Sequence, residues 1–89
     1  MLAIRQKAAA GTMESSDAFV EIEPAEDGLH IQLESVVLQQ FGEKIRACAQ
    51  DVLQQYGVQN ASVRIFDRGA LDCVIRARVE TAILRGKGE

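Results

Sequence analysis

The clearest folding signal in the chain is Asp17-Ala18-Phe19-Val20-Glu21-Ile22-Glu23-Pro24-Ala25-Glu26-Asp27-Gly28-Leu29-His30-Ile31-Gln32-Leu33-Glu34. Apolar and polar residues alternate over 17–23 and again over 29–34, which is the period of a strand with one buried face. Pro24 ends the first run, and Gly28 permits the positive φ of a turn. Two such runs joined by a short segment that contains glycine predict a β-hairpin.

Beyond this hairpin the spacing of apolar residues changes to that of helices. A first helix is expected from a Ser35 N-cap to Gly57, which supplies the C-terminal stop. A second helix is expected over 70–85, and a third strand over 62–67 lies between the two helices. The buried stripes of the helices are expected to comprise Val37 or Leu38, Phe41, Ile45, Cys48, Val52 and Tyr56, and then Leu71, Ile75, Val79, Ala82 and Ile83.

The element order β-β-α-β-α indicates a single small domain of the α+β class over residues 1–89. We expect a three-stranded sheet with both helices on one face and an irregular N-terminal segment over 1–16. Phe19 and Phe66 both fall on the face that should be polar, so we expect them to lie together there. This placement needs the 17–23 strand in the centre and a right-handed crossover from the 29–34 strand to the 62–67 strand.

Composition and charge argue against several classes of protein. The chain has 89 residues and a formal net charge of −3, and no apolar run approaches the ~20 residues that a membrane span needs. It has no concentrated basic patch with interleaved aromatic residues, so we expect no nucleic-acid partner and no membrane. The start lacks the apolar stretch of a secretory signal, and Cys48 and Cys73 are expected to be reduced core thiols of a cytoplasmic protein.

No combination of residues in the sequence predicts a catalytic or metal centre. His30, the single histidine, falls on the outer face of a strand and is best interpreted as a surface residue. Neither cysteine has a basic sequence context that favours the thiolate. Two distant cysteines and one histidine cannot form a zinc site. We therefore expect a protein that is not itself an enzyme.

The segment Ala10-Gly11-Thr12-Met13-Glu14-Ser15-Ser16-Asp17 is the strongest candidate for a functional site. Its small residues predict an exposed loop on which a modifying enzyme can reach a serine. The flanking Glu14 and Asp17 can orient a serine hydroxyl or a metal ion bound by that enzyme. From these residues alone, an ordinary serine-containing loop is the simpler interpretation.

This segment, with the runs 40–46 and 67–80, resembles the acyl carrier protein, or gamma subunit, of citrate lyase. The runs read Gln40-Phe41-Gly42-Glu43-Lys44-Ile45-Arg46 and Asp67-Arg68-Gly69-Ala70-Leu71-Asp72-Cys73-Val74-Ile75-Arg76-Ala77-Arg78-Val79-Glu80. The resemblance implies a carrier subunit that holds acetyl and citryl thioesters while citrate is cleaved to oxaloacetate and acetate. The partners it implies are the alpha subunit (acyl transferase), the beta subunit (citryl lyase) and the transferase that attaches the prosthetic group.

The resemblance also implies a covalently bound group, 2'-(5''-phosphoribosyl)-3'-dephospho-CoA. It is joined by a phosphodiester to the serine of a Gly-Thr-x-Glu-Ser pattern, which falls on Ser15 in this chain. The family commonly has glycine after that serine, whereas this chain has Ser16. Ser16 therefore stays the less favoured attachment point.

Two other interpretations stay open. The carrier protein of malonate decarboxylase resembles this family and uses the same type of arm, although Glu14 and the 69–78 run favour citrate lyase. A small α+β adaptor would present the same serine without modification. The intact mass of the protein from its native host separates the two carriers from the adaptor.

Charge is distributed unevenly along the chain. No basic residue lies between Lys7 and Lys44, and that interval is rich in acidic residues. An acidic surface can be steered towards a basic partner surface. We therefore expect docking on the larger subunits to involve Glu21, Glu23, Glu26 and Asp27.

Overall fold

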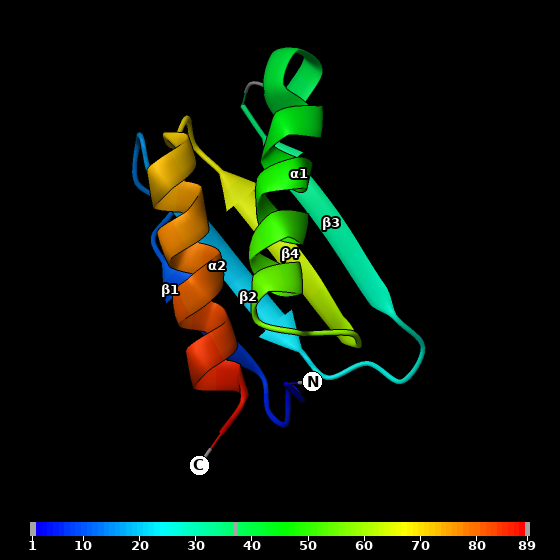
Figure 1. Cartoon of the computed structure of the whole chain (residues 1–89). Helices are drawn as coiled ribbons and strands as arrows, with labels where there is room; N and C mark the ends of the chain where they lie inside the picture. Colours follow the sequence, from blue (N-terminus) through cyan, green and yellow to red (C-terminus); the bar gives the residue numbers. More distant parts are fainter. Residues whose placement is uncertain (1, 37, 89) are drawn as a thin grey trace.

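The computed structural model describes residues 2–36 and 38–88 and has two layers, a four-stranded sheet and two helices on one face of it (Figure 1). The α+β class and the placement of the helices are confirmed, whereas the sheet has one strand more than expected. Val37, one option for the start of the first helical stripe, lies outside the described residues. The elements are β1 (Ala8–Gly11), β2 (Ala18–Glu23), β3 (Leu29–Ser35), α1 (Leu38–Gln55), β4 (Ala61–Asp67) and α2 (Asp72–Gly86).

The additional strand, β1, lies within the segment that was expected to be irregular. It pairs antiparallel with β2, and the register runs from Ala8 opposite Ile22 to Gly11 opposite Phe19. Alanine and glycine have low strand propensity, so the local sequence gives little signal. The strand forms because it pairs with the free edge of β2 and buries Ala10 against the core.

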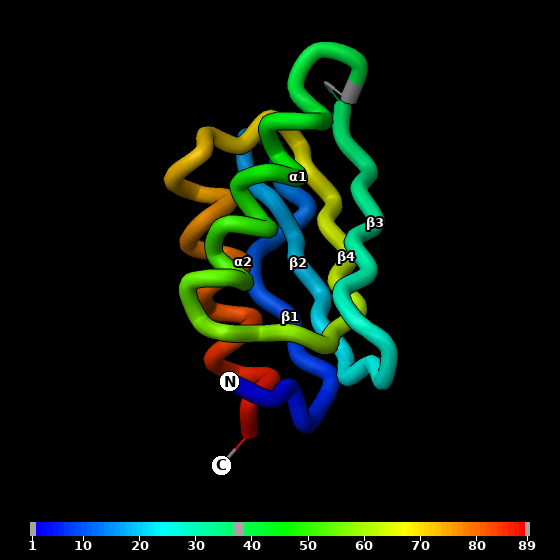
Figure 2. Tube along the Cα trace, turned by 45° about the vertical axis from the view of Figure 1, so that its right-hand side comes forward, coloured from blue at the N-terminus to red at the C-terminus, as the bar shows by residue number. Residues whose placement is uncertain are grey.

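The predicted hairpin is wrong, because β2 and β3 do not pair. The strand order is β1-β2-β4-β3, so β4 lies between them, antiparallel to β2 and parallel to β3 (Figure 2). The connection over residues 24–28 passes the start of β4 and is fastened to it. Ala61 donates its backbone N–H to the Gly28 carbonyl at 3.0 Å, and Asn60 Oδ1 accepts from the Gly28 N–H at 2.8 Å. The parallel pair is then closed by α1, the kind of crossover that parallel strands require.

The two phenylalanines do lie together on the open face of the sheet, as predicted. Phe19 and Phe66 are cross-strand partners, with ring centroids 6.2 Å apart and planes inclined at 38°. The Arg64 guanidinium lies 5.4 Å from the centre of the Phe66 ring. The expected strand order was nevertheless wrong. We expected β2 between β3 and β4, whereas β2 lies between β1 and β4.

The core lies between the helices and the inner face of the sheet. Alternate residues of β2 and β4 are fully buried, and they meet the inner stripes of α1 and α2. Burying an aliphatic side chain of this size contributes roughly 1.5–3 kcal/mol. The largest apolar members with almost no exposure are Val20, Ile22, Leu53, Val63, Ile65, Ile75, Val79 and Ile83.

Residues 2–7 run beside the end of α2. The backbone N–H groups of Arg5 and Gln6 donate to the Gly86 carbonyl at 2.8 and 3.1 Å, and Ile4 is buried in the core. A Cβ atom on Gly86 would lie 3.0 Å from Cγ2 of Ile22. The glycine therefore lets the end of the helix approach the sheet closely.

Several residues expected in the core are exposed at the other end of the molecule. Phe41 and Leu71 are 47% and 71% exposed, and Cys73 is exposed while Cys48 is buried as predicted. The two helices separate at this end (Figure 1), so the residues at their starts face a groove instead of each other. Ser35 is also not adjacent to the start of the helix it was expected to cap, because it ends β3 and α1 begins at Leu38. Its hydroxyl donates to a carboxylate oxygen of Asp67 at 2.7 Å.

Candidate functional site

The serine segment forms the connection between β1 and β2 at the end where the helices separate (Figure 1). The backbone N–H of Asp17 donates to the Glu14 carbonyl at 3.1 Å, which makes Ser15 and Ser16 the central pair of a β-turn. Ser16 has a φ of 66°, the only positive value at a non-glycine residue in the described chain. A positive φ at the third turn position alone is the signature of a type II turn.

The two serines differ in how the turn holds them. Both side chains are exposed, and neither hydroxyl forms a hydrogen bond with another described residue. The Ser16 backbone N–H, however, donates to the Arg68 carbonyl at 2.8 Å and sits in the left-handed region that favours glycine. Ser15 occupies the position before it, where no special backbone conformation is needed.

Asp17 is the residue that organises the turn. Nε and one terminal nitrogen of Arg78 donate to its two carboxylate oxygens at 3.0 Å each, and the Thr12 hydroxyl donates at 2.7 Å. The Ala18 N–H adds a further hydrogen bond at 2.7 Å. These hydrogen bonds hold the pKa of Asp17 far below its usual range, with the largest effect from Arg78, followed by Thr12 and then Ala18. Its carboxylate is therefore used to brace the turn and not to orient the Ser15 hydroxyl, the role suggested by the sequence.

Arg68 ties the same turn to the link between β4 and α2. Its backbone N–H donates to the Asp17 carbonyl at 2.9 Å, and its guanidinium donates to the Met13 carbonyl at 3.0 Å. Together with the bond from Ser16, this gives three hydrogen bonds between one residue and the turn. Neither Arg68 nor Arg78 was recognised from the sequence as part of the site, although both lie in the 67–80 run that carried the resemblance.

Gly11 fixes how the chain enters the turn. Its φ is +95°, and a Cβ atom there would lie 1.9 Å from the Ala18 carbonyl oxygen and 3.0 Å from Cδ of Arg78. A side chain at this position would collide with backbone that cannot be moved cheaply. The glycine therefore allows β1, β2 and Arg78 to meet at the base of the turn.

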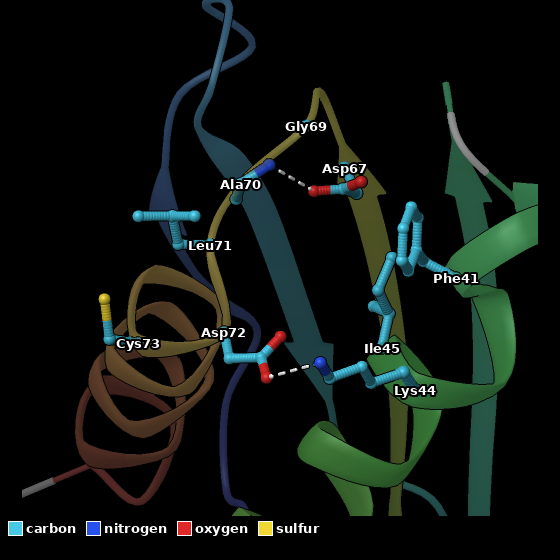
Figure 3. A pocket seen from close by; sticks show the side chains of 9 residues that line it. All are labelled: Phe41, Lys44, Ile45, Asp67, Gly69, Ala70, Leu71, Asp72 and Cys73. Carbon is cyan, nitrogen blue, oxygen red and sulfur yellow. Dashed lines mark hydrogen bonds and ion pairs between the residues drawn. The ribbon is translucent and has the colours of Figure 1, made fainter.

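A groove of about 550 Å³ opens beside the turn (Figure 3). One wall is formed by Phe41 and Ile45 of α1, and the other by Asp67 and residues 69–73, including Leu71. Figure 3 shows the Lys44–Asp72 ion pair, 3.4 Å long, crossing between the two walls. The sequence did not reveal this groove, because the periodicity placed both Phe41 and Leu71 in the core.

The remaining candidates are surface features. His30 is exposed, and its Nε2 lies 2.8 Å from a carboxylate oxygen of Asp27, an interaction that lowers the pKa of Asp27. Within residues 2–36 and 38–88, no group of histidine, cysteine and acidic side chains is arranged to hold a metal ion. The same residues contain no helix long and apolar enough to cross a membrane.

The acidic residues that the sequence suggested for docking lie away from the turn. Glu26 and Asp27 belong to the β2–β3 connection, which is at the opposite end of the sheet from Ser15 (Figure 1). Glu21 projects from the sheet near two cations, Lys7 at 3.9 Å and Arg64 at 3.6 Å. The part of Glu21, Glu23, Glu26 and Asp27 in docking stays a prediction.

Comparison with known proteins gives consistent matches over almost the whole chain. The family described as malonate decarboxylase delta subunit matches residues 5–86. The citrate lyase acyl carrier protein of Rhodopseudomonas palustris (strain BisA53) is 54% identical over 82 residues, covering 92% of this chain and 84% of the relative. The protein of the same name from Latilactobacillus sakei subsp. sakei is 46% identical over 86 residues, covering 97% and 85%.

A solved structure shows the same arrangement of elements. It is a chain of a Pseudomonas malonate decarboxylase hetero-tetramer in complex with malonate, with a TM-score of 0.79 and 26% sequence identity. The match covers 93% of this chain and 86% of that chain. The β1–β2 turn and the groove beside it therefore belong to a fold that occurs in a multi-subunit assembly.

Proposed function

The chain belongs to the citrate lyase acyl carrier protein family, and on that premise we propose that Ser15 bears 2'-(5''-phosphoribosyl)-3'-dephospho-CoA through a phosphodiester. When bound, this group supplies a thiol that carries acetyl and citryl as thioesters during the cleavage of citrate to oxaloacetate and acetate. The observation that carries the proposal is the Ser15 hydroxyl, exposed and without a hydrogen-bond partner among the described residues, on a braced turn.

The geometry of the turn fits such an attachment. A transferase must bring a nucleotide donor up to the hydroxyl, which needs an exposed serine on a backbone that stays in place. Asp17, Arg68 and Arg78 hold the turn by hydrogen bonds of 2.8 to 3.0 Å, none of which involves the Ser15 hydroxyl. The arm would then leave the protein without disturbing any interaction of the core.

The conformation of Ser16 supports Ser15 over its neighbour. Ser16 adopts the left-handed conformation that glycine adopts with the least strain. The family pattern places glycine directly after the modified serine, so Ser16 occupies the position of that glycine. Ser16 thus adopts the backbone conformation that a glycine at this position would favour.

The proposed partners are the alpha subunit, acting as acyl transferase, the beta subunit, acting as citryl lyase, and the transferase that attaches the arm. The proposed role of this chain is non-catalytic, since its residues position an anchor and the larger subunits act on the tethered group. Tethering a reactant by a flexible link gives an effective concentration in roughly the millimolar range. The acidic residues Glu21, Glu23, Glu26 and Asp27 are proposed to help association, and reversing their charges should slow association and weaken its salt dependence.

Intact mass and peptide mapping of the protein from its native host test the attachment. The expected result is a mass increase equal to the arm, located on the peptide that contains Ser15. Ser15→Ala should abolish the increase and the lyase activity of the reconstituted complex, while Ser16→Ala should keep both. Modification that survives Ser15→Ala and disappears in Ser16→Ala would move the site to Ser16.

A second candidate is the carrier subunit of malonate decarboxylase. It is favoured by the family match over residues 5–86 and by the fold shared with a chain of that decarboxylase. The relatives at 46–54% identity carry the citrate lyase name instead. Reconstitution of the modified carrier with the large subunits of each complex in turn separates the two, because activity is expected with the citrate lyase subunits only. An unmodified adaptor would show no mass increase at all.

A further inference from the structure

The groove beside α1 and the Ser15 turn form one hydrogen-bonded unit. Arg68 lies between Asp67 and Gly69, which both line the groove. The same Arg68 accepts a hydrogen bond from the Ser16 N–H at 2.8 Å and donates to the Met13 carbonyl at 3.0 Å. A group attached to Ser15 therefore starts within a few residues of one wall of the groove.

Two large apolar side chains of the groove are open to solvent. Phe41 and Leu71 belong to opposite sides of the groove and are 47% and 71% exposed; Figure 3 shows the Leu71 side chain directed away from Phe41, towards the outer edge. Two more of the five large apolar side chains exposed in the described chain belong to residues bonded to this region: the Met13 carbonyl accepts from the Arg68 guanidinium, and the Val36 N–H donates to the Asp67 carbonyl. Single exposed apolar residues are ordinary, but a group of them around a hollow marks a surface that binds something.

The polar groups of the groove sit at its floor and rim. Asp67 is 2% exposed, and its two carboxylate oxygens accept hydrogen bonds from the Ser35 hydroxyl at 2.7 Å and the Ala70 N–H at 2.8 Å. Lys44 and Asp72 form an ion pair at the rim, where both side chains are more than half exposed. An extended chain with apolar segments and a few amide groups can therefore bury its carbon atoms on Phe41 and Leu71 while its amides meet the rim.

The size of the groove also suits such a chain. Its volume of about 550 Å³ falls within the roughly 300–1,000 Å³ typical of small-molecule sites. The thiol end of a CoA-type arm has this chemistry, with a dimethyl-substituted carbon, two amides and a terminal sulfur. Because the arm is tethered at an effective concentration near millimolar, a groove with only about millimolar affinity would be filled half of the time.

Resting on attachment of the arm at Ser15, we propose that this groove is a resting site for the acylated end of the carrier's own arm. In the free carrier, Phe41, Ile45 and Leu71 cover the thioester and exclude water from it. The groove is open along one side and holds the chain weakly, so a partner subunit can draw the arm out into its own active site. The site thus protects the acyl group between transfers.

The experiment compares the unmodified carrier, the arm-bearing carrier and its acetylated form, each identified by intact mass. Methyl NMR signals of Leu71 and Ile45 are expected to shift on acetylation, while those of Leu84 stay in place. If the groove holds the arm half of the time, the acetyl thioester should hydrolyse about twofold more slowly than free acetyl-CoA in the same buffer, and more slowly still at a higher occupancy. Leu71→Ser should bring hydrolysis close to the rate of the free thioester, and Leu84→Ser, the matched exposed leucine, should leave the protection intact.

Two outcomes would overturn the proposal while leaving the attachment in place. One is an acetylated carrier, confirmed by mass, that hydrolyses at the free rate with unshifted Leu71 and Ile45 signals. The other is a shift of these signals only when a large subunit is added, which would make the groove a docking surface for protein. A carrier from the native host without added mass at Ser15 would instead refute the attachment, and with it the occupant of the groove.

Discussion

Asp17 and Arg78 lie 61 positions apart in the chain, and the guanidinium of Arg78 meets both carboxylate oxygens of Asp17 at 3.0 Å. Two nearly parallel hydrogen bonds between a guanidinium and a carboxylate fix the relative orientation of the two side chains as well as the distance between them. The pair joins the middle of α2 to the base of the Ser15 turn. The position of the proposed anchor is therefore set by the helix and not by the loop alone.

Removing this pair should loosen the turn and slow modification. Arg78→Ala leaves Asp17 with only Thr12 and Ala18 as hydrogen-bond donors, so the turn should open more often. We expect backbone amide exchange at Ser16 and Asp17 to become roughly tenfold faster, with a slower transfer of the arm to Ser15. Arg76→Ala is the matched control, because Arg76 pairs with Asp51 at 2.7 Å on the seam between the helices. Equal exchange rates in both variants would contradict the bracing role.

The Asp17–Arg78 pair should also make the stability of the protein depend on pH. The pKa of Asp17 is lowered in the folded protein from an ordinary value of 3.8, so its contribution to stability is complete above that value. As the pH falls below 3.8, the unfolded state takes up a proton that the folded state does not, and the contribution declines. Wild type should therefore exceed Asp17→Asn in stability by a constant amount between pH 7 and pH 5, and the difference should shrink towards pH 2. Urea unfolding at a series of pH values measures this, and a constant difference down to pH 2 would contradict it.

Gly11→Ala should destabilise the protein strongly. The added Cβ would lie 1.9 Å from the Ala18 carbonyl oxygen at a φ of +95°, so strain and collision act together, and we expect a loss of at least about 2–3 kcal/mol. Gly28→Ala is a fair control, since its φ is +109° and nothing lies within 4 Å of the new atom. That change should cost about 1 kcal/mol from backbone strain alone. Denaturant unfolding of the two variants would refute the close approach if their losses were equal.

Ser16→Gly, in contrast to Gly11→Ala, should stabilise the protein. Relief of the left-handed strain at a φ of 66° outweighs the extra freedom of glycine in the unfolded chain, and we expect a gain of about 0.5–1 kcal/mol. The turn type and the exposure of Ser15 should stay the same, so the arm should still be attached. Thermal unfolding and intact mass measure the two effects. A loss of stability would indicate that the Ser16 side chain contributes more than the exposed hydroxyl suggests.

The strand and helix patterns of the sequence predicted most of the elements but not their order in the sheet. Residues 18–23, 29–35 and 61–67 alternate clearly and are strands. Adjacent alternating runs favour a hairpin, and nothing local shows that β4 will lie between them. The central position of β4 agrees with its burial. Its inward-facing residues Ala61, Val63, Ile65 and Asp67 are all buried, as expected for a strand that is flanked by another strand on each side. The strand Ala8–Gly11 has almost no signal of its own, since it depends on the edge of β2.

The site was predictable only in part, for a similar reason. The serine segment was located from its sequence and from its family resemblance. The partners that hold it, Arg68 and Arg78, are distant in the chain and are brought close only by the folded sheet and α2. Helical periodicity placed Phe41 and Leu71 inside, and it cannot show that two helices separate at one end and leave their first residues beside an open groove.

The contact of Arg5 and Gln6 with the Gly86 carbonyl has a practical consequence for handling the molecule. Both chain ends emerge side by side, at the pole of the domain opposite the Ser15 turn (Figure 1). A fluorescent protein, affinity tag or surface linker fused at either end would therefore point away from the groove and from the Ser15 turn. For the same reason, joining the two ends by a short linker and reopening the chain within residues 24–28 should give a circular permutant with the turn unchanged.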